Sequence, residues 1–204
     1  MFHVYTDGGC HPNPGKGGWG FVVYSNGMEV HAACGGEAIT TNNRMEFSGI
    51  LMAMRWLGPK AAMIHTDSMY CLNAITKWHH KWAQNYWHKG TGKNAEPVKN
   101  AELIQECLAA KHKGHIFKWC KGHSGIVGNE RADRLAGIGR SGVGKAVEAE
   151  PVETQIITSN EDEIHARTHS QIYIPHCGCT HVLPWEDCEH TDALSAAAAA
   201  EMLA

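Results

Sequence analysis

The chain has 204 residues, with 18 Lys and Arg against 21 Asp and Glu. This length is enough for one buried domain with an appendage. No apolar run reaches the roughly 18 residues that a membrane span needs, and the N-terminus lacks the basic and apolar pattern of a secretory signal. We therefore expect no membrane partner and a cytoplasmic location.

The charge is unevenly distributed along the chain. Residues 1–141 hold 16 Lys and Arg against 10 Asp and Glu, a balance of +6. Residues 142–204 hold 2 against 11, a balance of -9. A basic body with an acidic tail indicates an anionic partner for the body, with ordinary solubilising charge as the alternative interpretation.

The first predicted elements are three strands. Residues 2–7 (FHVYTD) are expected to form a strand that ends at Asp7. A turn rich in Gly and Pro follows. Residues 19–25 and 28–36 are then expected to form two more strands around the turn signal Asn26-Gly27, giving an antiparallel meander.

Helical periodicity begins near Asn42, where Thr or Asn residues can cap a helix that Gly58-Pro59 ends. Residues 61–67 (AAMIHTD) read as a short strand that ends, like the first, in Thr-Asp. A helix is expected at about 69–80.

The rest of the body continues the alternation of helices and strands. Residues 100–113 form an amphipathic pattern with Asn100 as candidate cap, residues 115–122 read as a strand, and residues 128–139 as a final helix. The order indicates an α/β domain with a mixed sheet.

The composition of the sequence changes after residue 141. We predict a domain at 1–141, an acidic linker at 142–155 and an extension at 156–204 that ends in an Ala-rich stretch of high helix propensity. The first five cysteines stand singly in apolar segments, as reduced thiols of a reducing compartment do. The last three lie among histidines in the extension.

Two acids end predicted strands within similar short sequences, YTDGG for Asp7 and HTDSM for Asp67. Neighbouring strand ends converge on one edge of an α/β sheet, where ligand sites tend to lie. Glu46 shares a helix face with apolar Met45 and Ile50, and Asp133 lies in the last predicted helix. Carboxylates brought together repel one another unless a cation neutralises them, and oxygen ligands favour Mg²⁺ or Mn²⁺.

Each acid also has an ordinary structural explanation. Asp7 fits a turn, Glu46 the first turn of a helix, Asp67 a helix N-cap and Asp133 a surface ion pair. Spacing alone does not decide between these roles and a metal site.

Four sequence blocks decide it. YTDGGCHPNPGKGGWG, TTNNRMEFSGILMAM, HTDSMYCLNAITKW and WCKGHSGIVGNERADRLA resemble the motif blocks of the type 1 ribonucleases H, in the right order over about residues 1–140. The resemblance implies an RNase H-like fold, with a five-stranded mixed sheet flanked by helices. It also implies endonucleolytic hydrolysis of the RNA strand of RNA–DNA hybrids by a two-metal-ion mechanism.

The resemblance assigns roles to particular residues. It makes Asp7, Glu46, Asp67 and Asp133 ligands of two Mg²⁺ ions, with Mn²⁺ as a substitute and Asp7 as the bridge between the ions. His123, in KGHSG, becomes the loop histidine of proton transfer or product release.

The resemblance also implies substrate contacts. Near the RNA strand it places Asn13, Asn42, Asn43 and the backbone around Cys10. Thr41 with Asn100 fits a pocket for a phosphate of the DNA strand. Met69 departs from the polar Gln that bacterial relatives often carry, which predicts a weaker grip on substrate at that point.

A basic, aromatic segment runs from residue 77 to residue 99, with five Lys against one acid. It resembles the basic protrusion of bacterial family members. Electrostatic contact with a nucleic-acid backbone is the expected role, with packing of the tryptophans in the core as the alternative. The residues expected to contact substrate are Trp78, Lys81, Trp82 and Lys89.

The extension carries Cys177-x-Cys179 and Cys188-x-His190. Two such pairs suit structural Zn²⁺, with an acidic tail bearing free thiols as the alternative. The resemblance does not reach this segment, which we expect to contact either another protein or the catalytic body.

The sequence therefore predicts a monomeric ribonuclease H whose partner is an RNA–DNA hybrid. A non-catalytic hybrid-binding module with the same basic face is the alternative from a different class. A resolvase or integrase of the same fold is the third, and it fits the four blocks less well.

Overall fold

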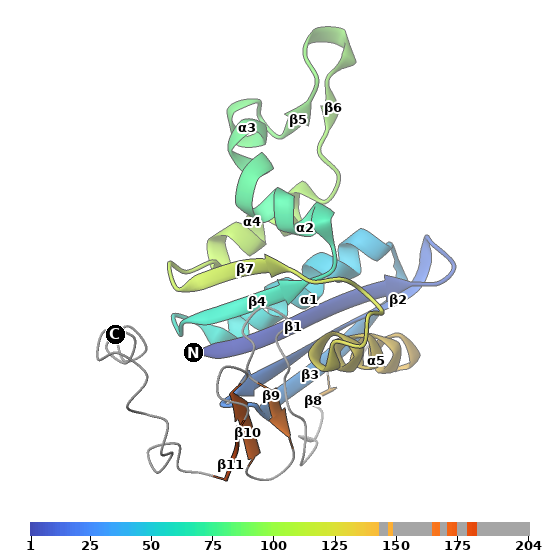
Figure 1. Ribbon diagram of the computed structural model, residues 1–204. Helices are drawn as coiled ribbons and strands as arrows, with labels where there is room; N and C mark the ends of the chain where they lie inside the picture. Colours follow the sequence, from blue (N-terminus) through green and yellow to red (C-terminus); the bar gives the residue numbers. More distant parts are fainter. Residues whose placement is uncertain (143–146, 149–164, 168–170, 175–178, 183–204) are drawn as a thin grey trace, which may run out of the picture.

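The structure is a computed structural model of the chain. It describes residues 1–142, 147–148, 165–167, 171–174 and 179–182. Its main element is a mixed sheet with strand order β7-β4-β1-β2-β3-β8 (Figure 1). Strand β2 pairs antiparallel with both β1 and β3, whereas β4 pairs in parallel with both β1 and β7. The strands are β1 (Phe2–Cys10), β2 (Gly15–Ser25), β3 (Met28–Thr40), β4 (Ala62–Thr66), β7 (His115–Trp119) and β8 (Val147–Glu148).

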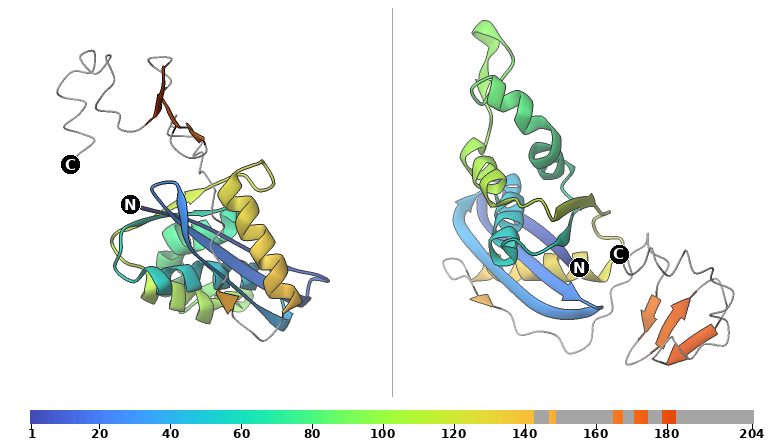
Figure 2. Two further views of the ribbon diagram at one scale, coloured as in Figure 1. Left: turned by 90° about the horizontal axis from the view of Figure 1, so that it is seen from below. Right: turned by 90° about the vertical axis from the view of Figure 1, so that its left-hand side faces the viewer.

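Helices cover both faces of this sheet (Figures 1 and 2). Val4 of β1 packs in one apolar cluster with α1 and α4, whereas the next residue, Tyr5, packs in a second cluster with α5. This alternation follows from the two-residue period of a strand. The helices of the body are α1 (Asn42–Leu57), α2 (Met69–Asn73), α3 (His79–Gln84), α4 (Ala101–Ala110) and α5 (Val127–Ser141).

The predicted hairpin between β2 and β3 is confirmed. Asn26 and Gly27 both have positive φ, at 50° and 78°. A two-residue turn of this kind matches the twist of the flanking strands, which is why Asn-Gly is favoured there.

The five expected strands are present, and β8 adds a two-residue edge beyond β3. It lies within the segment predicted as a linker and pairs Glu148 with Ala33 and Val147 with Cys34. The edge of β3 offers free backbone groups that any extended segment can pair with.

The prediction that the first strand ends at Asp7 is wrong. β1 continues to Cys10, because β2 keeps pairing with it from Asp7↔Gly20 to Cys10↔Gly17. Its parallel pairing with β4 does stop at Thr6↔Thr66. Asp7 therefore lies one residue past the end of the parallel part of the sheet, and Asp67 directly follows β4.

The helix expected at 69–80 is present in a different form. After α2, residues Ala74–Trp78 form a π-helical turn that leads into α3. The side chain of Ser68 caps α2 by accepting from the Cys71 amide, so Asp67 is free of a capping role.

Two helices begin at the expected capping residues but without a capping hydrogen bond. Thr41 and Asn100 occupy the N-cap positions of α1 and α4, but neither side chain makes a capping hydrogen bond. Asn100 has a left-handed backbone (φ 58°), whereas a capping side chain normally belongs to a residue in the extended region.

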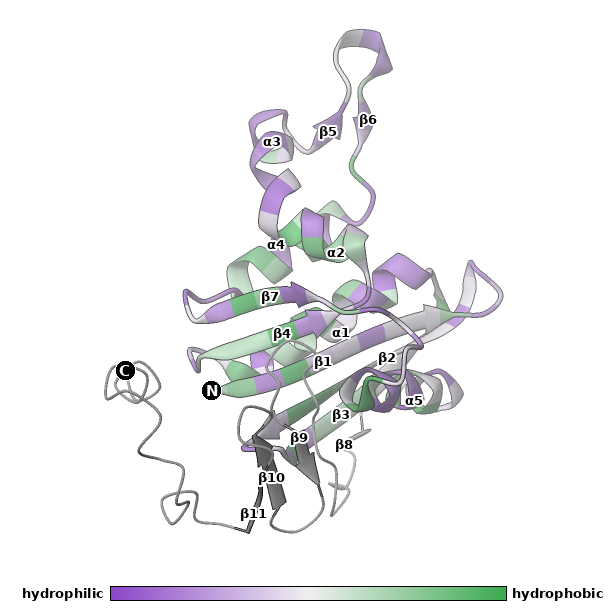
Figure 3. Ribbon diagram, in the orientation of Figure 1, coloured by the Kyte–Doolittle hydropathy of each residue, from purple (hydrophilic) through white to green (hydrophobic). Residues whose placement is uncertain are grey.

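The part of the chain that carries α3, β5 and β6 projects from the body (Figure 1), and residues 77–99, which contain it, are called the basic protrusion below. Beyond α3 they include β5 (His88–Lys89), the 3₁₀ turn Gly92–Asn94 and β6 (Glu96–Pro97). The projecting part is largely hydrophilic (Figure 3). At its base Trp82 is buried in the larger apolar cluster.

In the extension, β9 (His165–Arg167), β10 (Gln171–Ile174) and β11 (Cys179–Val182) form an antiparallel sheet. Cys177, Cys188, His190 and the Ala-rich stretch lie outside the described residues, and Cys179 is described only as part of β11. Within the described ranges, no helix is long and apolar enough to cross a bilayer.

Candidate active site

Three of the four predicted acids converge at one edge of the sheet. Asp7 on β1, Glu46 on α1 and Asp67 after β4 each place a potential ligand atom within 4.8 Å of the others. The in-register pair Thr6↔Thr66 brings Asp7 and Asp67 to the same edge.

Gly8 allows α1 to approach closely enough to add Glu46. A Cβ atom at Gly8 would lie 2.2 Å from the backbone carbon of Met45 and 2.3 Å from the amide nitrogen of Glu46. Only hydrogen fits in that space. The glycine after Asp7 is thus a packing requirement of the site as well as part of the motif.

The electrostatics of this cluster disfavour three ionised acids. Burial raises the pKa of Asp7 to about 7, and the neighbouring Asp67 and Asp133 raise it too, against an amide hydrogen bond from Gly8 and the nearby His123. The pKa of Glu46 also lies well above its ordinary value because of burial and the charges of Asp7 and Asp67. A cation bound here would reverse both effects.

The residues fit a divalent cation. All three contribute hard carboxylate oxygens, the donors that Mg²⁺ and Mn²⁺ prefer. Oε2 of Glu46 is buried without any hydrogen-bond partner in the described structure. An orphaned buried carboxylate oxygen is costly unless a ligand satisfies it.

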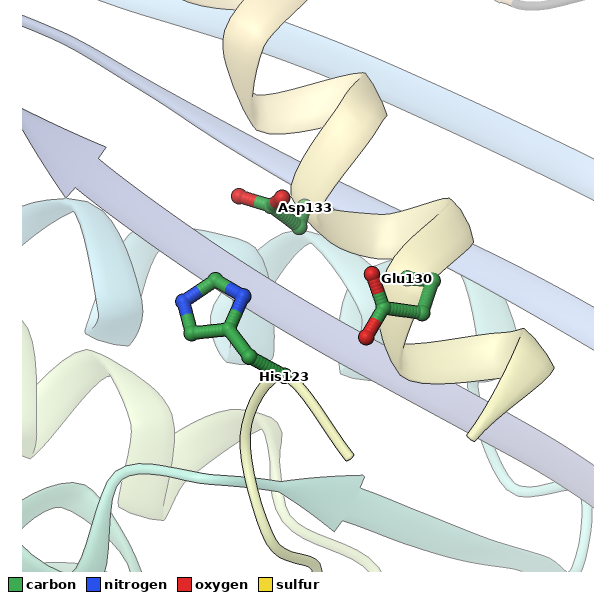
Figure 4. Close-up of side chains that lie close together, drawn as sticks. All are labelled: His123, Glu130 and Asp133. Atoms are coloured by element: carbon green, nitrogen blue, oxygen red, sulfur yellow. The ribbon is translucent and has the colours of Figure 1, made fainter. Parts of the chain in front are cut away.

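A second group of potential ligands adjoins the first. His123, on the loop after β7, lies with Glu130 and Asp133 of α5, and their ligand atoms are within 4.8 Å of one another (Figure 4). Glu130 was not among the residues predicted from the sequence. Its separation of three residues from Asp133 was the available signal, because residues three apart share a helix face.

Residues of both groups line one cleft of about 390 Å³. Asp133 lines it together with the first three acids and His123, so the structure brings all five predicted catalytic residues to one place. Arg140 of α5 also lines the cleft and is a cation that the sequence analysis did not single out.

Three predicted substrate contacts are linked by hydrogen bonds beside the acids. The amide of Cys10 donates to Oδ1 of Asn42 at 2.7 Å, and the amide of Asn42 donates to Oδ1 of Asn13 at 3.4 Å. Asn13 thereby satisfies a free amide at the start of α1. Asn43, beside Asn42 in the first turn, is exposed.

The predicted contacts on the basic protrusion differ in exposure. Lys81 and Lys89 are exposed and Trp78 is 40% exposed, whereas Trp82 is only 8% exposed. The ammonium group of Lys89 lies 5.3 Å from the centre of the Trp82 ring. Trp82 therefore packs as a core residue that supports an exposed cation, which was the alternative interpretation of this ring.

The remaining pair, Thr41 and Asn100, marks the starts of α1 and α4. Arg44 in the first turn of α1 forms a salt bridge of 3.0 Å with Glu102 in the first turn of α4. The two helix N-termini are thus tied together. Helix N-termini present free amides that suit an anion.

Comparison with known proteins places this site in a family. A sequence model of the family described as RNase H matches residues 1–141. The chain belongs to the ribonuclease H family. Curated relatives named ribonuclease H include those of Rhizobium meliloti, 44% identical over 152 residues (74% of this chain and 97% of the relative), and Chromohalobacter salexigens, 47% identical over 135 residues (65% and 80%).

The fold agrees with this assignment. The crystal structure of LC9-RNase H1, described as a type 1 RNase H with the type 2 active-site motif, superposes with a TM-score of 0.62 at 31% identity. The match covers 75% of this chain and 77% of that one. The RNase H-like fold and ribonuclease H hydrolase activity expected from the sequence are thus confirmed.

Proposed function

We propose that residues 1–141 hydrolyse the RNA strand of RNA–DNA hybrids with two Mg²⁺ ions held in the acidic cleft. The observation that carries the proposal is the convergence of Asp7, Glu46 and Asp67 within 4.8 Å around a buried, unpartnered oxygen of Glu46. Bound ions would neutralise the carboxylates, activate a water and stabilise the leaving oxygen of the phosphodiester.

The four acids and His123 have distinct parts in this reaction. Asp7, Glu46, Asp67 and Asp133 would hold the two ions, and Asp7 would serve as the ligand that both share. His123 is exposed on its loop, so its imidazole reaches solvent and suits the transfer of a proton at the end of the reaction. No side chain is required as a nucleophile.

The substrate is held by the elements around the cleft. The linked set Cys10, Asn13 and Asn42, with exposed Asn43, lies against the RNA strand, where polar groups can recognise the 2′-hydroxyl. The paired helix starts at Thr41 and Asn100 receive a phosphate of the DNA strand. Trp78, Lys81 and Lys89 of the basic protrusion contact the backbone of the hybrid, supported by Trp82.

The test is a hybrid substrate with different fluorophores on its RNA and DNA strands. We expect wild type to cleave only the RNA strand in Mg²⁺ or Mn²⁺, and Asp7→Asn to lose more than about 100-fold of that activity because both ions lose a ligand. Equal activity of the two proteins, or cleavage of the DNA strand, would refute the mechanism. Tight hybrid binding without turnover would support the alternative of a binding module.

For the whole chain we propose a monomer in the cytoplasm. The division into a domain at 1–141, a linker at 142–155 and an extension at 156–204 is part of this proposal, as is a structural Zn²⁺ held by Cys177, Cys179, Cys188 and His190. Elemental analysis with and without residues 142–204 tests the zinc site. Metal content that is unchanged by the truncation would exclude it.

A further inference from the structure

Asp67 and the residue before it are held in place by the end of β7, by the residue after it and by α5. The indole Nε1 of Trp119 donates to the backbone oxygen of Asp67 at 3.0 Å. The amide of Cys120 donates to the backbone oxygen of the preceding Thr66, also at 3.0 Å. The side-chain amide Nδ2 of Asn129, on α5, donates to Oδ2 of Asp67 at 3.4 Å.

Asn129 is itself oriented by a buried thiol. Sγ of Cys120 donates to Oδ1 of Asn129 at 3.3 Å. Both residues are almost inaccessible, with 1% of Asn129 and 7% of Cys120 exposed. The three side chains therefore form a chain of hydrogen bonds from Cys120 through Asn129 to the Asp67 carboxylate.

The chemistry of Asp67 and Cys120 determines which group donates in each of these hydrogen bonds. An ionised carboxylate can only accept hydrogen bonds, so it needs the NH₂ group of Asn129. The carbonyl oxygen of Asn129 then faces Cys120 and needs a donor. Burial, with the nearby charges of Asp67 and Asp7, raises the pKa of Cys120 to about 12, so the thiol keeps its proton and can donate.

The loop between Cys120 and Asn129 also closes over the carboxylate. A Cβ atom at Gly122 would lie 2.6 Å from Oδ2 of Asp67. The same oxygen is thus bounded by Gly122 on one side and hydrogen-bonded by Asn129 on another.

We propose that Asn129 is a positioning residue for Asp67, and that Cys120 sets the orientation of the Asn129 amide. The inference rests on the proposed function, because it treats Asp67 as a metal ligand. It assigns to two side chains that touch neither ion nor substrate the task of presenting one carboxylate oxygen to the cation. Groups that orient a ligand in this way typically change metal affinity about 10- to 100-fold when removed.

The experiment measures the affinity of the full-length protein for Mn²⁺ and Mg²⁺ by calorimetry, without nucleic acid. Asn129→Leu removes the amide at similar size and is expected to weaken binding about 10- to 100-fold. Cys120→Ala is expected to weaken it by a smaller factor, and Cys120→Ser, which keeps a donor, to restore it. Cys107→Ala is the matched control.

The control separates positioning from general stability. Cys107 is also buried, and its thiol lies against the backbone carbonyl oxygen of Phe47, with no hydrogen bond to Asn129 or Asp67 among those of the described residues. Cys107→Ala should lower the melting temperature and leave ion affinity unchanged. If Asn129→Leu does not fold, the comparison of Cys120→Ala with Cys120→Ser and Cys107→Ala still decides.

The outcomes distinguish this inference from the proposed function. Unchanged ion affinity in Asn129→Leu and Cys120→Ala, with an active wild type, overturns the positioning role alone. A wild type that binds ions but cleaves no hybrid overturns the proposed function, while the variants still test the positioning role. A wild type without measurable ion affinity overturns both.

Discussion

The guanidinium of Arg131 on α5 donates two hydrogen bonds to the carboxylate of Glu29 on β3, from Nε at 3.2 Å and from Nη2 at 3.0 Å. Both side chains are nearly inaccessible, with 10% and 0% exposed. This ion pair ties the helix that carries Asp133 to the far strands of the sheet.

Removing one partner of this pair should destabilise the protein strongly. Glu29→Gln removes the carboxylate charge from this buried ion pair, and breaking such a pair typically lowers the free energy of unfolding by about 3–5 kcal/mol. Urea unfolding followed by circular dichroism measures the change. The control is Arg55→Ala, which breaks the half-exposed pair of Arg55 with Glu106 and should change stability by about 1 kcal/mol or less. Equal effects of the two substitutions would contradict the prediction.

Asp7→Asn should stabilise the metal-free protein at alkaline pH while abolishing activity. The folded-state pKa of Asp7, about 7, exceeds its ordinary value of 3.8. Between these values the unfolded chain loses the Asp7 proton before the folded one does, so the stability of wild type falls as pH rises and is lowest above about pH 7. Asparagine at position 7 does not ionise, so the variant does not lose this stability as pH rises.

Melting temperatures in EDTA check this at several pH values. The advantage of Asp7→Asn should be largest near pH 8 and should shrink steadily toward about pH 5. Excess Mg²⁺ should raise the melting temperature of wild type more than that of the variant, because binding stabilises the folded state. A variant that is less stable than wild type in EDTA at pH 8 would rule out the raised pKa.

The lysines of the basic protrusion should set the salt dependence of hybrid binding. Replacing exposed Lys81 and Lys89 with Ala removes up to two phosphate contacts, each worth about 0.9 in the slope of log affinity against log salt. We expect a raised KM with little change in kcat. Lys113→Ala is the control. Lys113 lies just before the start of β7, whereas Asp67 follows the end of the parallel strand β4, so the two residues lie at opposite ends of these strands. The same change of slope in the control would argue for a general charge effect.

Gly8→Ala should damage both stability and metal binding, whereas Gly9→Ala should be tolerated. A methyl group at Gly8 meets the backbone of Met45 and Glu46, but one at Gly9 meets nothing within 4 Å. Overpacking of this kind typically lowers the free energy of unfolding by about 1–3 kcal/mol or more. Thermal unfolding and Mn²⁺ titration of the two variants measure it. Similar behaviour of both would show that the close approach of α1 to β1 is not needed.

The sequence carried enough information to predict the sheet, its helices and the convergence of the acids. Alternating apolar residues and the Asn26-Gly27 signal gave the hairpin, and the helical spacing around Glu46 gave α1. The motif blocks then brought Asp7, Glu46, Asp67 and Asp133 to one cleft, where the structure also has them.

Features that depend on contacts between distant residues could not be predicted from local sequence patterns. The extension of β1 past Asp7 depends on continued pairing with β2, which no pattern within residues 2–7 encodes. The hydrogen-bond chain through Cys120 and Asn129 likewise joins residues 9 and 62 positions apart. The sequence analysis treated Cys120 only as a reduced core thiol, because its partners become visible only in three dimensions.

The row formed by Thr6, Thr66 and Trp119 across the three parallel strands has a consequence for how this protein can evolve. Asp7 and Asp67 each follow that row by one residue, and the loop with His123 leaves β7 at the same level. Deleting a single residue within β4 would turn every side chain beyond it to the opposite face of the sheet. The lengths of these strands are therefore under tighter constraint than their apolar side chains, which can exchange for others of similar volume.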